Sequence, residues 1–124
     1  MSKIDQARAF IAANERKDWQ ALRAAMADGI VYHNIPMPRI TGADEAVAML
    51  KQFMGAAEKI EWEIIAIAED AEGRVLNERI DRFFLPGGKV IALPVCGVFE
   101  FAHDKVTAWR DYFDLADFQR QMAG

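Results

Sequence analysis

Four runs of β-forming residues decide the fold of this chain: EWEIIAIA (61–68), RVLNERIDRFFL (74–85), VIALPVCGVFEF (90–101) and VTAWRDYF (106–113). Only short segments with turn chemistry separate them, among them Pro86-Gly87-Gly88 and Ala102-His103-Asp104. Parallel neighbours need long crossover connections, whereas antiparallel neighbours are joined by short turns. The stretch therefore predicts an antiparallel meander of four strands.

Two helices are predicted before the first strand. Ser2 and Asp5 form a capping box ahead of apolar residues at helical spacing. Asp18 is expected to cap a second helix, which continues until Asp28-Gly29 ends it. A short strand over residues 30–34 follows, because this run is rich in β-forming residues and the two prolines after it cannot continue a ladder.

A third and a fourth helix complete the expected order. Thr41 and Asp44 form a capping box for the third helix, which ends near residues 55–58. Asp114 caps the last helix. Its inward residues are expected to be Leu115, Phe118 and Met122. Helices that precede a block of antiparallel strands predict an α+β fold, here as one domain over residues 1–124.

The composition excludes several classes of protein. The chain has 124 residues, 52% of them hydrophobic, with 15 basic and 19 acidic side chains and a net charge of −4. A chain of this size buries about two thirds of its unfolded surface, which suffices for one core but not for a second domain. Because it has no run of basic residues, neither nucleic acids nor membrane surfaces are expected as partners. The charged N-terminus and the lack of a long apolar stretch predict a cytoplasmic protein.

Cysteine and histidine are too few to suggest a metal centre. Cys96 has no partner for an internal disulfide, and its spacing from His33 and His103 matches no ligand pattern. We expect Cys96 to be a small core residue and the two histidines to lie in or beside surface loops. No metal site is therefore predicted.

The second run of the meander has an unusual face. Positions 75, 77, 79, 81 and 83 share one side of a strand. That side places the Arg79 guanidinium beside the Asp81 carboxylate among apolar groups. The opposite side also carries charges, in Glu78 and Arg82, so alternation alone leaves open which side is buried.

The last run carries a second carboxylate, Asp111, between two aromatic residues of the same face. Simple hairpins at the two tight turns give the pairs Phe84–Lys89, Phe101–Val106, Asp111–Cys96 and Cys96–Asn77. In this register Arg79 and Asp111 share a face two strands apart. A bulge of one residue turns a strand over, and Pro94 and Gly97 are where one is expected.

The short strand over residues 30–34 adds Tyr32 and Asn34 on one face. A phenol and an amide can hold a water molecule, and two neighbouring aspartates with an arginine between them titrate as a unit. One carboxyl group then serves as acid and the other as base, so the set favours acid–base catalysis. The alternative is a structural ion-pair network inside the sheet.

Four segments of this chain resemble the limonene-1,2-epoxide hydrolase family: Tyr32-His33-Asn34-Ile35-Pro36, Glu78-Arg79-Ile80-Asp81, Gly97-Val98-Phe99 and Trp109-Arg110-Asp111-Tyr112-Phe113-Asp114-Leu115. The likeness runs in register from about Ser2 to Met122. It implies a strongly curved, mixed but mainly antiparallel sheet that forms a cone closed by the N-terminal helices, the cystatin-like or nuclear transport factor-like fold. It also implies a homodimer.

The same resemblance implies roles for the polar residues. Asp111 would be the base that activates water, and Tyr32 and Asn34 would position that water. Asp81 would protonate the epoxide oxygen, and Arg79 would bridge the two carboxylates. The implied reaction is one-step hydrolysis of a hydrophobic epoxide to a vicinal diol, without a cofactor or a covalent intermediate.

Substrate-binding residues also follow from the resemblance: Phe53, Phe83, Leu93, Val95, Phe113 and Phe118. Here it conflicts with the simple hairpin register, which turns Ala92, Pro94 and Cys96 inward instead. A bulge near Gly97 would reconcile the two, and we follow the resemblance.

Two other functions remain open. Chemistry like that of ketosteroid isomerase or a polyketide cyclase would use a carboxylate base, with a tyrosine and a protonated acid as donors. Arg79 beside both acids argues against it, because a cation stabilises their ionised forms. The second alternative is a non-catalytic domain that binds a small ligand or dimerises.

Overall fold

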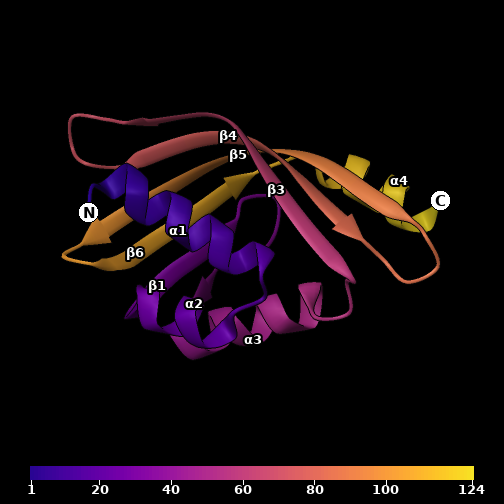
Figure 1. Ribbon diagram of the computed structural model, residues 1–124, viewed down its shortest axis with the longest axis horizontal. Helices are drawn as coiled ribbons and strands as arrows, with labels where there is room; N and C mark the ends of the chain where they lie inside the picture. Colours follow the sequence, from indigo (N-terminus) through magenta and orange to yellow (C-terminus); the bar gives the residue numbers. More distant parts are fainter.

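The computed structural model describes residues 1–124, and Figure 1 shows its helices arranged around one curved sheet. The helices are α1 (Lys3–Glu15), α2 (Trp19–Ala25), α3 (Ala43–Met54) and α4 (Leu115–Ala123). The strands are β1 (Met26–Asn34), β2 (Ile40–Thr41), β3 (Lys59–Glu69), β4 (Val75–Phe84), β5 (Val90–Ala102) and β6 (Lys105–Tyr112). The predicted α+β order is confirmed. None of the helices combines the length and the apolar character needed to cross a membrane.

The six strands form one mixed sheet in the order β2-β1-β6-β5-β4-β3, and this sheet does not close on itself. Strands β3 to β6 are consecutive antiparallel neighbours, which confirms the predicted meander. Strand β1 instead pairs in parallel with β6, and the long chain between these two strands makes that pairing possible. This pairing brings Asn34 level with Asp111.

The turn between β4 and β5 joins the strands one residue out of the expected register. Gly87 and Gly88 take positive φ values of 91° and 93°, a conformation that glycine adopts without strain. Phe84 consequently faces Val90, and the predicted pair of Phe84 with Lys89 is wrong.

A bulge lies near the start of β6, not on β5 as expected. The predicted pair of Phe101 with Val106 forms, but the next pair joins Glu100 to Ala108. One extra residue of β6 thus separates the two pairs, and β6 shifts by one position relative to β5.

As a result, the face of β5 that points into the core is the opposite of the one that the simple register predicts. This holds for its pairing with β4 and for its pairing with β6. Gly97, not Cys96, lies level with Asn77 and Asp111. Ala92, Pro94 and Cys96 are exposed, so their inward placement and the core position of Cys96 are wrong. Leu93 and Val95 are buried, as the resemblance implied.

The helix caps follow the sequence closely. Side-chain oxygens of three predicted caps accept backbone N–H groups: Ser2 from Asp5 at 3.0 Å, Asp18 from Ala21 at 3.1 Å and Asp114 from Asp117 at 3.1 Å. The end of α2 differs, because Met26 is already extended (φ −93°, ψ 138°) and begins β1. Asp28 does not end the helix but pairs with Arg23 at 2.9 Å.

Two further expectations are corrected at α3 and α4. The capping box of Thr41 and Asp44 is absent, because Gly42 occupies the N-cap of α3 with a φ of 109° and Thr41 belongs to β2. Met122 of α4 does not face inward, since its side chain is 47% exposed.

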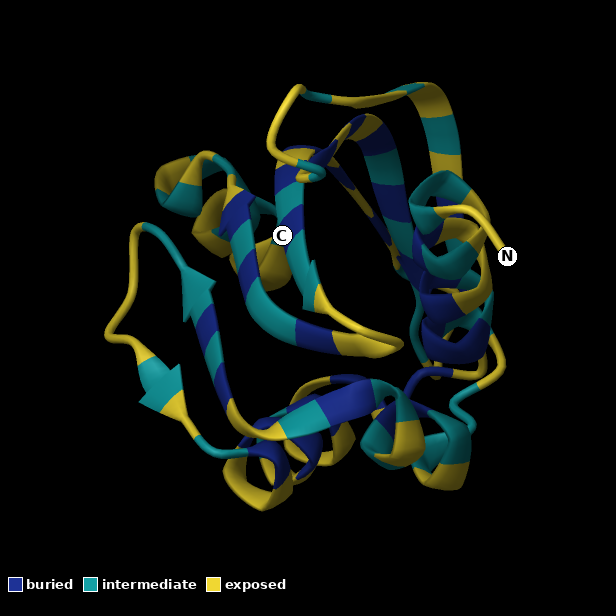
Figure 2. Cartoon of the chain, turned by 90° about the vertical axis from the view of Figure 1, so that its left-hand side faces the viewer, coloured by how far each residue is buried: buried dark blue, intermediate teal, exposed yellow.

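The concave side of the sheet encloses the core together with α1 and α3. Figure 2 shows buried residues alternating with less buried ones along the strands. Phe10 of α1 packs edge-on against Phe99 and Trp109, with ring centroids 5.5 and 5.1 Å apart. Tyr32 of β1 stacks on Trp109 at 4.3 Å. These rings fix β1, β5 and β6 against α1 next to the buried polar residues described below.

Candidate active site

Arg79 of β4 lies at the centre of a buried polar cluster, and its side chain is fully buried. Its Nε donates to Oδ1 of Asp81 at 2.7 Å, and its Nη2 donates to Oδ2 of Asp81 at 3.2 Å. Nη2 also donates to Oδ2 of Asp111 at 2.6 Å. One guanidinium thus bridges two buried carboxyl groups from β4 and β6. The predicted shared face of Arg79 and Asp111 is confirmed.

Two more side chains hold the guanidinium in place. Asn77 accepts a hydrogen bond from Nη1 of Arg79 at 2.8 Å, and its own amide donates to the Gly97 carbonyl at 3.2 Å. The ring of Trp62 lies 4.6 Å from the guanidinium carbon, a cation–π contact. In-plane partners together with an aromatic face restrict this planar group to one orientation.

Asp111 is held from its other side by Trp109. The indole Nε1 donates to Oδ1 of Asp111 at 2.9 Å, while Arg79 occupies Oδ2. The parallel register of β1 and β6 sets Tyr32 level with Trp109 and Asn34 level with Asp111. The phenol, the amide and both aspartates therefore meet at one cavity.

Burial and charge separate the titration of these groups. The pKa of Asp81 is raised to about 7, and burial is the main cause. The adjacent Arg79 acts in the opposite direction, and the nearby Asp111 contributes to the rise. Burial disfavours the charge of Arg79, but its attraction to Asp111 and Asp81 outweighs this and raises its pKa. Burial, and then the charge of Asp111, raise the pKa of Tyr32. Near neutral pH the site thus holds a fixed cation, a neutral phenol and one carboxyl group poised to give up a proton.

A cavity of about 240 Å³ opens onto this cluster. Its walls include Tyr32, Asn34, Asp81 and Asp111, and also Phe53, Phe83, Leu93, Val95, Phe113 and Phe118. Among the predicted site residues only Arg79 is absent from the walls, because it lies behind the two carboxyl groups. A mostly apolar cavity with a few polar groups suits a small apolar ligand that carries one reactive polar function.

Sequence reasoning missed several residues of the site. Asn77 and Trp109 lie two positions before Arg79 and Asp111 on the same strand faces, and this spacing is the signal that identifies them. Trp62 gives no such signal, because its place opposite Asp81 depends on the pairing of β3 with β4. The remaining wall residues are Met37, Met49, Leu50, Met54, Leu115 and Gln119.

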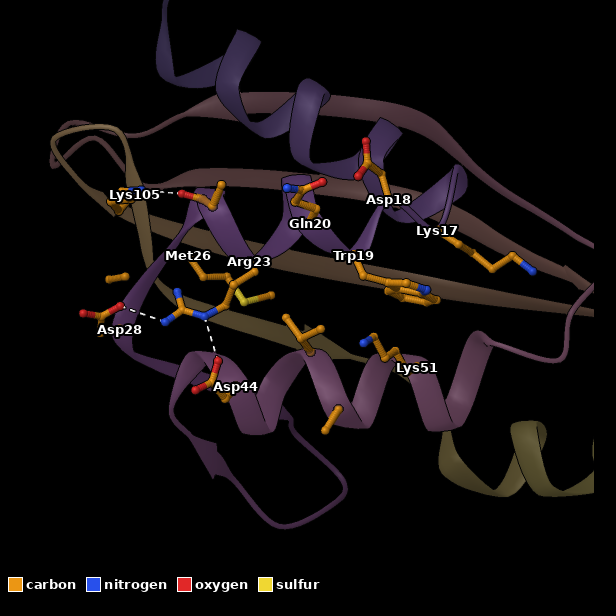
Figure 3. Close-up of a pocket in the computed structure, with 14 residues that line it drawn as sticks. Lys17, Asp18, Trp19, Gln20, Arg23, Met26, Asp28, Asp44, Lys51 and Lys105 are labelled. Carbon is orange, nitrogen blue, oxygen red and sulfur yellow. Dashed lines mark hydrogen bonds and ion pairs between the residues drawn. The ribbon is translucent and has the colours of Figure 1, made fainter.

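A larger hollow of about 1100 Å³ lies between α2 and α3, and Figure 3 shows its charged side chains. Arg23 is already paired with Asp28 and Asp44, both at 2.9 Å. Lys17 donates to the Ala57 carbonyl at 2.5 Å. Arg23 and Lys17 are thus engaged by groups of the protein itself, and this hollow shows no buried cluster like that around Arg79.

Comparison with known proteins gives one family over nearly the whole chain. Residues 1–123 match the family described as the limonene-1,2-epoxide hydrolase catalytic domain. The chain is 34% identical over 110 residues to a protein of Mycobacterium tuberculosis named epoxide hydrolase EphG, covering 88% of this chain and 71% of that protein.

Solved structures give the same family and a wider fold. The structure of an epoxide hydrolase from M. tuberculosis, described as limonene-epoxide-hydrolase-like, is 33% identical with a TM-score of 0.84 and covers 98% of this chain and 89% of its own. A polyketide cyclase candidate from Pseudomonas putida has a TM-score of 0.85 at 20% identity and covers 98% of each chain. At that identity the second structure is evidence for the fold alone.

Gly97 tests how tightly the site is packed. A Cβ at this position would lie 2.6 Å from Nη1 of Arg79 and 2.7 Å from Oδ1 of Asp111. We expect Gly97→Ala to lower the free energy of unfolding by about 1–3 kcal/mol in urea denaturation, as overpacking does. Gly29→Ala is the matched control, because a Cβ there meets nothing within 4 Å. Equal stability of the two variants would contradict the close packing described here.

Proposed function

Because this chain belongs to the limonene-1,2-epoxide hydrolase family and is an epoxide hydrolase, we propose that it converts a hydrophobic epoxide to a vicinal diol in one step. The observation that carries this proposal is the single Arg79 guanidinium bridging two buried aspartates beside an apolar cavity. Two carboxyl groups held by one cation supply an acid and a base together, which is what the opening of an epoxide by water requires.

Asp111 is the base in this mechanism. Water held by Tyr32 and Asn34 attacks one ring carbon and passes a proton to the Asp111 carboxylate. Trp109 and Arg79 occupy the two oxygens of Asp111 from within the protein, and so aim the carboxylate at the cavity. Water is a poor nucleophile, so removal of its proton during attack lowers the barrier.

Asp81 is the acid. As the ring C–O bond breaks, Asp81 gives its proton to the epoxide oxygen, so that no free alkoxide forms. Its raised pKa supports this role, because an acid must hold a proton at working pH and release it readily. After the product leaves, a proton passes from Asp111 back to Asp81, and the sum is epoxide plus water giving diol.

Arg79 keeps the two carboxyl groups in place and in different protonation states. Its bonds to both of them fix the distance between acid and base. A single positive charge is matched by a single negative one when Asp81 is protonated and Asp111 is ionised. This balance makes the reactive protonation state the least costly one to bury.

The walls of the cavity define the substrate class. Phe53, Phe83, Leu93, Val95, Phe113 and Phe118 present apolar surface. We infer that they bind the hydrocarbon part of the substrate, while the epoxide oxygen lies at Asp81. Isomerase or cyclase chemistry is disfavoured, because the relatives with 33–34% identity are named epoxide hydrolases, whereas the polyketide cyclase candidate shares only the fold at 20% identity.

The role of Asp111 predicts a large loss on substitution. With a panel of hydrophobic epoxides that includes cyclic terpene, aryl and linear types, we expect Asp111→Asn to lower the rate of diol formation about 100- to 10,000-fold, the contribution of a well-placed general base. Asp104→Asn, in the exposed turn before β6, is the control and retains the native rate. A native rate in Asp111→Asn, or no diol from the native protein with any member of the panel, would refute the proposed mechanism.

The role of Asp81 predicts the direction of the pH dependence. A pKa of about 7 keeps the proton on Asp81 below that pH, and the acid is lost as pH rises through it. We therefore expect kcat to fall about tenfold per pH unit above about pH 7, measured from initial rates of diol formation. Circular dichroism across the same range checks that the fold persists. A kcat that stays constant from pH 7 to pH 9 would exclude Asp81 as the acid.

We also propose that two copies of this chain pair through the convex face of the sheet. Apolar side chains on that face are unusually exposed, including Leu76 at 44% and Tyr112 at 46%. Exposed apolar patches on a sheet mark protein interfaces. We expect light scattering to give twice the 14.0 kDa of one chain, and Leu76→Arg to shift the mass toward 14.0 kDa while Ala116→Arg on α4 does not. A native mass of 14.0 kDa would exclude the dimer.

A further inference from the structure

A second apolar hollow lies directly outside the catalytic cavity, between α3, α4 and the turn that joins β4 to β5. This groove has a volume of about 370 Å³. Its lining residues are Met49, Gln52, Phe53, Phe83, Leu85, Ile91, Phe118 and Met122. Gln52 is the one polar residue among them, so the groove offers an apolar surface with no charge to neutralise.

The groove and the cavity share a common wall. Met49, Phe53, Phe83 and Phe118 line both of them. The ring of Phe53 packs against those of Phe83 and Phe118, each with centroids 5.4 Å apart. Phe53 is nevertheless 48% exposed, so this ring stands at the rim where the two spaces adjoin.

The cavity alone is small for an apolar substrate of ordinary size. Its volume of about 240 Å³ lies below the roughly 300–1,000 Å³ of typical ligand pockets. Joined to the groove, it falls inside that range. A compact epoxide fits the cavity, whereas a longer substituent has to leave it past Phe53.

Helix α4 forms the outer wall of the groove and is fastened to the sheet. The Gln121 side chain accepts from the Ala92 N–H and donates to the Ala92 carbonyl, both at 2.8 Å. Lys89 donates to the Met122 carbonyl at 2.8 Å. The two Gln121 bonds use a part of the β5 edge that β6 does not cover, and together with the Lys89 bond they attach α4 to the sheet.

We propose that this groove binds the distal apolar part of the substrate, so that the protein prefers epoxides with a long, unbranched hydrocarbon substituent. This inference rests on the proposed function, because the epoxide ring must sit at Asp81 and Asp111 while the chain passes Phe53. The groove raises affinity for long substituents by burying methylene groups that a compact substrate lacks. Met122, 47% exposed, lines the groove but not the cavity, so that only the longer ligand reaches it.

The preference is measured with two terminal epoxides that differ only in chain length. We expect kcat/KM for 1,2-epoxydecane to exceed that for 1,2-epoxyhexane about tenfold or more, since each fully buried methylene contributes a factor of about four. Met122→Glu places a carboxylate in the groove, and we expect it to lower this ratio about tenfold. Ala116→Glu adds the same charge to an exposed part of α4 outside the groove and leaves the ratio as it is.

Binding of the diol products gives a readout that needs no turnover. By calorimetry, decane-1,2-diol binds the native protein more tightly than hexane-1,2-diol, and Met122→Glu but not Ala116→Glu removes the difference. Equal affinity for the two diols, or equal effects of the two variants, would overturn the groove proposal. Chain-length-dependent binding that requires Met122, with no hydrolysis of either epoxide, would overturn the proposed function and leave the groove as a ligand site.

Discussion

A buried positive charge constrains the architecture around it. The Arg79 side chain is inaccessible to solvent, and a charge in that position is tolerated only with close counter-charges and filled donor sites. Asp81 supplies the first counter-charge from the same strand, and Asp111 supplies the second from a strand two places away. Strand β5 runs between them, so the ion pair has to form across its backbone. Gly97 at that crossing point leaves the necessary space.

In the proposed mechanism, this constraint also accounts for how one site holds an acid beside a base. Two aspartates in similar burial would compete for one proton if they had the same neighbours. Their neighbours differ, because Asp111 accepts an additional indole N–H from Trp109 whereas Asp81 receives only the guanidinium. The support for the site therefore extends into the aromatic core, where Trp109 packs against Phe10, Phe99 and Tyr32. Core packing and the orientation of the polar groups depend on the same ring.

Local chemistry predicted most of the elements, and long-range register was the main source of error. Caps at Ser2, Asp18 and Asp114 are visible in the sequence because each involves residues three positions apart. Which face of β5 points inward is not visible in this way, because it depends on the glycine turn before β5 and on one bulge in β6. No short sequence pattern indicates the length of either. One error of register lay between β4 and β5, and the other lay between β5 and β6. Each amounted to one residue, and the two cancel in the position of β4 relative to β6. For that reason the shared face of Arg79 and Asp111 was predicted from the residues alone, whereas the walls on β5 required the family resemblance.

The parallel pairing of β1 with β6 has a consequence for how the site assembles in time. Tyr32 and Asn34 come from the first strand of the chain and Asp111 from the last, so the pair that joins them closes the longest loop in the sheet. Contacts of such separation form slowly, because the chain entropy of the loop must be lost before the contact contributes any stability. The Arg79–Asp81 bond, by contrast, lies within one strand and needs only the meander. During synthesis the ion pair can therefore form as soon as β4 and its neighbours are available, whereas the complete constellation waits until the C-terminal strand docks against a strand made much earlier.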